Sequence, residues 1–137
     1  MTGTWEGPAR IVLVHDDVGF AGQVTASLVA TGNQVCAFEN PLQALDSLKP
    51  EHQVDVLITR LSFGEGLSNG LSLAMMARNR RPTIKVLFVA LEENRPYADG
   101  VGEFLASPAP VDEVVAAADR LLLSDLPARS TRSPAVA

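Results

Sequence analysis

The sequence predicts an α/β domain in which helices cover both faces of a parallel sheet. Short apolar runs alternate with amphipathic stretches of ten or more residues, and five such strand and helix units can be counted along the 137 residues. Apolar residues make up 47% of the chain and charged residues 20%, a mix typical of a folded globular protein. A chain of this length suits one domain.

The first unit is a strand over residues 11–14 followed by a helix over residues 18–30. The strand is a run of branched apolar residues that ends at a polar edge. The helix carries an apolar side chain at every fourth position, and Gly32 supplies its stop. The polar edge consists of His15, Asp16 and Asp17, and the apolar stripe consists of Phe20, Val24 and Leu28.

The second unit pairs a strand over residues 34–38 with a helix that begins after Asn40 and ends at Pro50. Cys36 lies in the middle of the strand's apolar run, so we expect a buried core thiol. The third unit has the most strand-like run of the chain, residues 54–59. A glycine-containing loop then leads to a helix over 71–80, in which Met75 and Met76 lie at the spacing of core residues.

The fourth strand is predicted over residues 84–89, and Pro96 limits the segment that follows to a short or irregular helix. The fifth strand covers 103–106, and Pro110 begins the last helix. Three parts of the chain are therefore expected: an N-terminal extension over 1–9, the domain over 10–124, and a flexible tail over 125–137.

Composition argues against several classes of function. A net charge of −5 disfavours a sequence-independent grip on nucleic acid phosphates. The sequence has neither a signal peptide pattern nor an apolar run long enough to span a membrane, so we expect a cytoplasmic protein without membrane contact. A single cysteine forms neither an internal disulfide nor a cysteine-rich metal site.

The order of these features resembles a receiver domain of two-component response regulators. The resemblance covers about residues 10–124 and rests on Ile-Val-Leu-Val-His15-Asp16-Asp17, on Asp55-Val-Leu-Ile-Thr-Arg60, and on Phe104-Leu-Ala-Ser107-Pro108. It implies a flavodoxin-like, doubly wound sheet of five parallel strands in the order 2-1-3-4-5. The functional crevice of such a sheet lies outside the carboxyl ends of its central strands.

The resemblance also implies a phosphorylation pocket, and here that pocket is degenerate. In the family, two acidic residues after the first strand hold magnesium; Asp16 keeps one of them and His15 replaces the other. The phosphoacceptor aspartate aligns with Arg60, whose guanidinium stays protonated and cannot act as the nucleophile. The Ser or Thr hydroxyl that contacts the phosphoryl group aligns with Ala90. The lysine that stands before a cis proline aligns with Ser107, which is followed by Pro108.

A permanent cation beside two carboxylates suggests how this pocket is held. We expect Arg60 to pair with Asp16 or Asp17 and to lock the site without metal. The alternative is that Arg60 points to solvent without a partner. Asp16 is the residual candidate for binding magnesium. His15 is interpreted as a hydrogen-bonded histidine at the strand edge, and the alternative is a metal ligand.

The sequence therefore predicts a non-enzymatic, receiver-like module of signal transduction that acts through protein–protein interaction and needs no cofactor. Its partner face, for another protein or a second copy, is expected around Val115, Leu122 and Leu123. Two alternatives stay open: a phosphorelay receiver that still takes metal and phosphoryl group through Asp16 or Asp17, and a flavodoxin-like module that binds a small ligand in the crevice.

Overall fold

A five-stranded parallel sheet in the order β2-β1-β3-β4-β5 forms the centre of the molecule. The computed structural model describes residues 10–48, 53–61 and 69–123, so the predicted extension over 1–9 and the tail over 125–137 lie outside the described residues. The predicted strand order is confirmed. The strands are β1 (Arg10–Val14), β2 (Gln34–Phe38), β3 (Val56–Thr59), β4 (Lys85–Ala90) and β5 (Glu103–Ala106).

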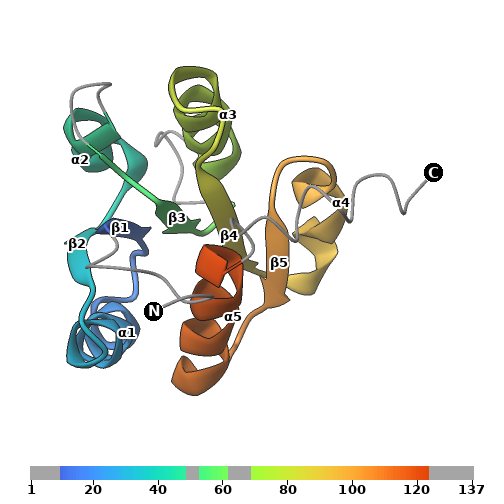
Figure 1. The fold of residues 1–137 in the computed structure, drawn as a ribbon. Coiled ribbons are helices and arrows are strands. Elements are labelled where there is room, and N and C mark those ends of the chain that lie inside the picture. Colours follow the sequence, from blue (N-terminus) through green and yellow to red (C-terminus); the bar gives the residue numbers. More distant parts are fainter. Residues whose placement is uncertain (1–9, 49–52, 62–68, 124–137) are drawn as a thin grey trace.

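Helices cover both faces of this sheet (Figure 1). On one face, α1 (Val18–Ala30) and α5 (Val111–Leu123) lie side by side and share a core with the strands. On the other face lie α2 (Pro41–Ala44), a 3₁₀ turn over Leu45–Leu48, and α3 (Gly70–Arg80). This arrangement is the doubly wound architecture expected from the alternation of strands and helices.

The fourth crossover is short, as predicted. A 3₁₀ turn over Glu92–Asn94 leads into the four-residue helix α4 (Arg95–Ala98), and Pro96 lies in its first turn. Proline is compatible with the first turn because the amide that it lacks would have no helical partner there. Gly100 follows the helix with a positive φ of 80°, a backbone conformation that glycine adopts without strain.

Two apolar cores, one on each face, hold the layers together. All residues of β3 are buried, and in β4 all but Lys85 are buried, because these central strands are covered on both faces. The core beneath α1 and α5 includes Leu13, Leu28 and Val114. The core beneath α2 and α3 includes Leu57, Leu73 and Phe88.

Charged side chains make contacts along the β5 edge of the sheet. We call this surface the β5 rim, and it consists of Glu92, Arg95, Glu103, Phe104 and Arg120. The Arg95 guanidinium donates from Nε to a carboxylate oxygen of Glu92 at 2.6 Å. The same guanidinium lies over the Phe104 ring, 4.6 Å from its centroid. Arg120 of α5 donates to Glu103 of β5 at 3.0 Å.

Three predictions of burial are wrong. Cys36 is exposed because β2 is an edge strand, on which every other residue is also at least partly accessible. Met75 is 57% exposed and Met76 36% exposed. The buried residues of α3 are Gly70, Leu73, Ala74 and Ala77, so the core stripe runs along the opposite side of that helix.

The predicted partner face also needs correction at Leu122. This side chain is only 4% exposed and belongs to the core beneath α1 and α5, whereas Leu123 is 43% exposed. Val115 is half-buried against the same core and lines a groove between α1 and α5. The three residues therefore do not form one exposed patch, because adjacent helical residues point about 100° apart. Among the described residues, no helix has the length and apolar character needed to cross a membrane.

Candidate functional site

The carboxyl ends of β1 and β3 bring the predicted site residues together. In the parallel register Val14 lies opposite Thr59, so the next residues, His15 and Arg60, are neighbours. We call this edge, just beyond the carboxyl ends of the strands, the mouth of the sheet. The Arg60 amide donates to the Val14 carbonyl at 3.3 Å, and the His15 amide donates to the Phe38 carbonyl at 3.0 Å. These bonds continue the sheet ladder beyond the strands and fix both backbones.

Arg60 forms an ion pair across this mouth. Its Nη1 donates to Oδ1 of Asp16 at 2.6 Å, joining residues that are 44 positions apart in the sequence. The side chains are 25% and 44% exposed, so the pair is partly shielded from water. Burial alone would raise the pKa of Asp16, but the hydrogen bond and charge of Arg60 outweigh it and lower that pKa. Of the two pairings predicted for Arg60, this is the one with Asp16.

Asp17 caps the helix that follows. Its Oδ1 accepts a hydrogen bond from the Phe20 amide at 3.0 Å, and its own backbone is extended, as an N-cap residue requires. A carboxylate at this position is also favoured by the positive end of the helix dipole. The two carboxylates after β1 therefore have different partners. Asp16 pairs with Arg60, whereas Asp17 caps α1.

His15 is hydrogen-bonded at the strand edge, as predicted, and it is also buried. Its Nδ1 accepts from the Asp17 amide at 3.0 Å, and its ring lies 4.9 Å from the ring of Phe20, centroid to centroid. Burial, followed by the nearby charge of Arg60, lowers the pKa of His15 and outweighs the opposite effect of Asp16 and Asp17. The shift favours the neutral imidazole, and its proton lies on Nε2 because Nδ1 serves as an acceptor.

The ends of β4 and β5 complete the site. Ala90 is buried at the end of β4, and its carbonyl accepts from the Ser107 amide at 2.7 Å. The peptide bond between Ser107 and Pro108 is cis, which matches the cis proline implied by the resemblance. The alanine methyl and the serine hydroxyl therefore stand at the same sheet edge as Arg60.

Sequence reasoning missed the role of Gly70, the first residue of α3. A Cβ atom built on this residue would lie 1.6 Å from the carbonyl oxygen of Arg60 and 2.8 Å from the Thr59 hydroxyl. The backbone of α3 therefore touches the backbone of the site, and only glycine permits this approach. A glycine just before a helical pattern is the only sequence signal of the contact, and many turns carry the same signal.

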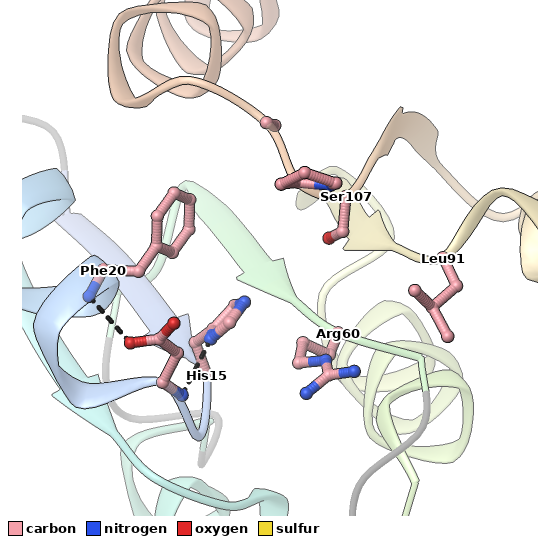
Figure 2. A pocket seen from close by; sticks show the side chains of 8 residues that line it. His15, Phe20, Arg60, Leu91 and Ser107 are labelled. Atoms are coloured by element: carbon pink, nitrogen blue, oxygen red, sulfur yellow. Dashed lines mark hydrogen bonds between the residues drawn. The ribbon is translucent and has the colours of Figure 1, made fainter.

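The side chains at the mouth line a pocket of about 290 Å³ (Figure 2). Figure 2 shows His15 and Phe20 on one side, Arg60 at the end of β3, and Leu91 and Ser107 on the far side. The pocket thus gathers residues from all the strand ends at this edge except that of β2. Its lining consists of His15, Asp17, Phe20, Arg60, Leu91, Ser107, Pro108 and Ala109.

The donor set does not fit magnesium. This ion prefers several oxygen ligands in octahedral geometry. Here Asp16 is paired with a guanidinium, Asp17 caps a helix, and Arg60 places a cation beside them. Within the described ranges, no group of three His, Cys, Asp or Glu residues is arranged to hold a metal ion.

Asp55 lies at the opposite edge of the sheet, directly before β3. Its carboxylate accepts from the Arg10 amide at 2.9 Å, at the beginning of β1. This acidic residue therefore has a structural role that is remote from the mouth. The charged groups at the mouth are the acidic pair and Arg60.

Comparison with curated proteins gives two similar transcriptional regulatory proteins. The chain is 28% identical over 130 residues to the transcriptional regulatory protein GlrR of Escherichia coli K12 and, to the same extent, to QseF of Escherichia coli O157:H7. In both cases the match covers 91% of this chain but only 29% of the relative. The chain thus spans less than a third of the length of these regulators. No protein-family model matches the sequence.

Solved structures with a similar fold include receiver domains. The response regulator receiver protein from Sinorhizobium medicae has a TM-score of 0.74 and 20% identity over 84% of this chain and 94% of that one. The HemR receiver domain from Leptospira biflexa has a TM-score of 0.73 and 24% identity over 83% of this chain and 94% of that one. A Burkholderia pseudomallei response regulator with a phosphorylated aspartic acid has a TM-score of 0.69, 23% identity, and coverage of 91% and 74%. The chain has the fold of response-regulator receiver domains.

Proposed function

We propose that this domain is a receiver-type signalling module that is not phosphorylated at the usual position and acts by binding another protein. The observation that carries the proposal is the contact of 2.6 Å between the Arg60 guanidinium and Asp16. A guanidinium cannot form an acyl phosphate, and its charge occupies the space beside the acidic pair. The comparisons support the signalling context through the receiver fold and the two transcriptional regulatory relatives.

The remaining residues of the pocket support the same proposal. Ala90 has no hydroxyl to contact a phosphoryl oxygen, and Ser107 has no cation to neutralise one. Asp17 is engaged by the Phe20 amide, so its Oδ1 is not a free nucleophile. We therefore infer no enzymatic activity and no phosphotransfer.

Phosphorylation is tested by incubating the protein with magnesium and acetyl phosphate and then measuring its intact mass. We expect the parent chain to stay unmodified. The matched variant carries His15→Asp, Arg60→Asp, Ala90→Thr and Ser107→Lys, which restores the missing groups, and we expect it to gain one phosphoryl group. Labelling of the parent chain at Asp16 or Asp17, located by peptide mass spectrometry, would contradict the proposal.

Protein binding is tested at the exposed apolar residues beside the β5 rim. Tyr97 is 61% exposed and Leu123 43% exposed, so both can be changed without opening the core. We expect Tyr97→Glu combined with Leu123→Glu to weaken self-association or partner capture while thermal unfolding stays unchanged. Light scattering that shows a monomer at every accessible concentration, together with a variant that captures the same partners as the parent, would count against this part of the proposal.

A further inference from the structure

The pocket at the mouth presents hydrogen-bond donors to its interior. The Nε2–H of His15 is a donor because Nδ1 already accepts from the Asp17 amide. Figure 2 shows this ring nitrogen directed toward the space between Ser107 and Arg60. Among the described residues no hydrogen bond of the Ser107 hydroxyl is found, and Arg60 uses Nη1 for Asp16, which leaves further N–H groups on its guanidinium.

The rest of the lining is apolar. Phe20 is partly buried and Leu91 is exposed, and together with Pro108 and Ala109 they line the same pocket of about 290 Å³. This volume is at the small end of the range for ligand sites, which runs from roughly 300 Å³ upward. It suits a molecule with one ring and one polar substituent. Apolar walls with a few convergent polar groups are the usual make-up of a small-molecule site.

Charge decides which polar substituent fits. The guanidinium of Arg60 is already compensated by Asp16, and Asp17 adds a second carboxylate at the N-terminus of α1. With His15 neutral, the mouth carries one more negative charge than positive charges. An added anion would meet this excess without a free cation, and an added cation would face the N–H groups of His15 and Arg60. A neutral group that accepts hydrogen bonds meets neither obstacle.

We propose that this pocket is a binding site for a small, uncharged ligand with a carbonyl-type acceptor on an apolar ring. The acceptor receives hydrogen bonds from His15 Nε2 and the Ser107 hydroxyl, and the ring lies against Phe20 and Leu91. The site uses the donors that remain once Arg60 and Asp16 are paired. It is separate from the proposed protein-binding role, because it concerns the mouth and not the exposed residues beside the β5 rim.

Three probes of nearly equal shape test the proposal: benzamide, benzoate and protonated benzylamine. Each is titrated into ¹⁵N-labelled protein at pH 7 while backbone amide shifts are recorded. We expect benzamide to shift the amides of Phe20, Leu91, Ser107 and Ala109 in a saturable way, with a dissociation constant of about 1 to 10 mM for a ligand of this size. Benzoate and benzylammonium are expected to bind at least about fivefold more weakly.

Two serine variants provide the matched control. Ser107→Ala removes one donor from the pocket and is expected to weaken benzamide binding about threefold to tenfold. Ser27→Ala removes a hydroxyl from α1 in the groove between α1 and α5, and it should leave the affinity unchanged. The amide spectrum of each variant without ligand shows that the fold is retained.

Three results would overturn the inference. The first is the absence of saturable benzamide shifts up to about 20 mM, beyond the affinity expected for this ligand size. The second is tighter binding of benzoate than of benzamide, which would mean that the charge argument is wrong. The third is a set of shifts centred on the α1–α5 groove and unaffected by Ser107→Ala. A failure of the phosphorylation test leaves these readouts unaffected, so the two proposals can fail separately.

Discussion

The mouth of the sheet and the β5 rim each hold an arginine–carboxylate contact of 2.6 Å, yet the two contacts differ in what they join. At the mouth, Arg60 and Asp16 follow two different strands and are 44 residues apart. At the rim, Arg95 and Glu92 are three residues apart on one exposed turn. The same distance therefore describes a tertiary contact in one case and a local contact in the other. Burial and connectivity, and not distance, decide how much an ion pair stabilises a fold.

The largest effect is expected from breaking the backbone support of the mouth. Gly70→Ala places a methyl group where the Arg60 carbonyl stands, so α3 and β3 must move apart. We expect the free energy of unfolding to fall by about 3 kcal/mol, as in other overpacked sites. Urea denaturation followed by circular dichroism measures this change.

Gly22→Ala is the matched control for that substitution. Gly22 lies inside α1, and beyond its chain neighbours and the backbone of its own helix nothing lies within 4 Å of the position of its added Cβ. Alanine should stabilise the helix there by about 0.5 to 1 kcal/mol. Equal effects of the two substitutions would show that the approach of α3 to Arg60 is not a constraint on the fold.

A smaller effect is expected from the ion pair itself. A double-mutant cycle with Arg60→Ala and Asp16→Asn should give a coupling free energy of about 1 kcal/mol, the upper end for partly exposed pairs. The same cycle with Arg95→Ala and Glu92→Gln should give a coupling below detection, because these side chains are 52% and 63% exposed and the pair is screened by water. If the rim pair couples as strongly as the mouth pair, the contrast between the two regions fails.

The smallest effect is the pH dependence that the mouth adds to stability. Because the pKa of His15 is lowered from 6.5, the unfolded chain binds a proton more readily than the folded one. The contribution of His15 to the free energy of unfolding should therefore be fully present above pH 6.5 and decrease as the pH falls below that value. His15→Gln removes this part of the slope, which unfolding curves at pH 7 and pH 5 measure. A steeper slope in the variant would contradict the assignment.

Asp16 acts in a lower pH window. Its folded pKa lies below the ordinary value of 3.8, so its contribution is present above that value and is lost as the pH falls below it. Arg60→Ala should remove this acid-limb contribution, whereas Arg95→Ala should leave the mouth unaffected. Acid titration of the Asp16 carboxyl signal by NMR measures the difference directly.

The sequence predicted the central strands well because a strand that is buried on both faces needs apolar residues at nearly every position. The predicted run over 54–59 contains β3, and the predicted run over 84–89 differs from β4 by one residue at each end. The short fourth helix was also predictable, because Pro96 and Gly100 restrict the backbone locally.

Helix faces and strand edges were less predictable, because they depend on tertiary neighbours. Met75 and Leu73 are both apolar and lie two positions apart, and only the sheet decides which of them is buried. The sequence likewise did not separate Leu122 from Leu123. Cys36 is apolar in context, but its strand lies at the end of the sheet order, where cover is incomplete.

The sequence predicted which residues gather at the candidate site, but not which of them contact one another. Arg60 and the acidic pair were singled out from the sequence, and their pairing was expected. The sequence could not decide which carboxylate would take the guanidinium, since that depends on Asp17 serving as the cap of α1. The contact of Gly70 with Arg60 and the direction of the His15 donor follow from packing and have no local signature.

The exposed position of Cys36 has a practical consequence for any measurement of assembly. The thiol stands at the centre of β2, whose five residues include no charged side chain to keep a neighbouring molecule away. In aerated buffer two molecules can oxidise to a covalent pair at this cysteine. Samples prepared without reductant would then contain a dimer that has nothing to do with signalling, and Cys36→Ser removes that artefact.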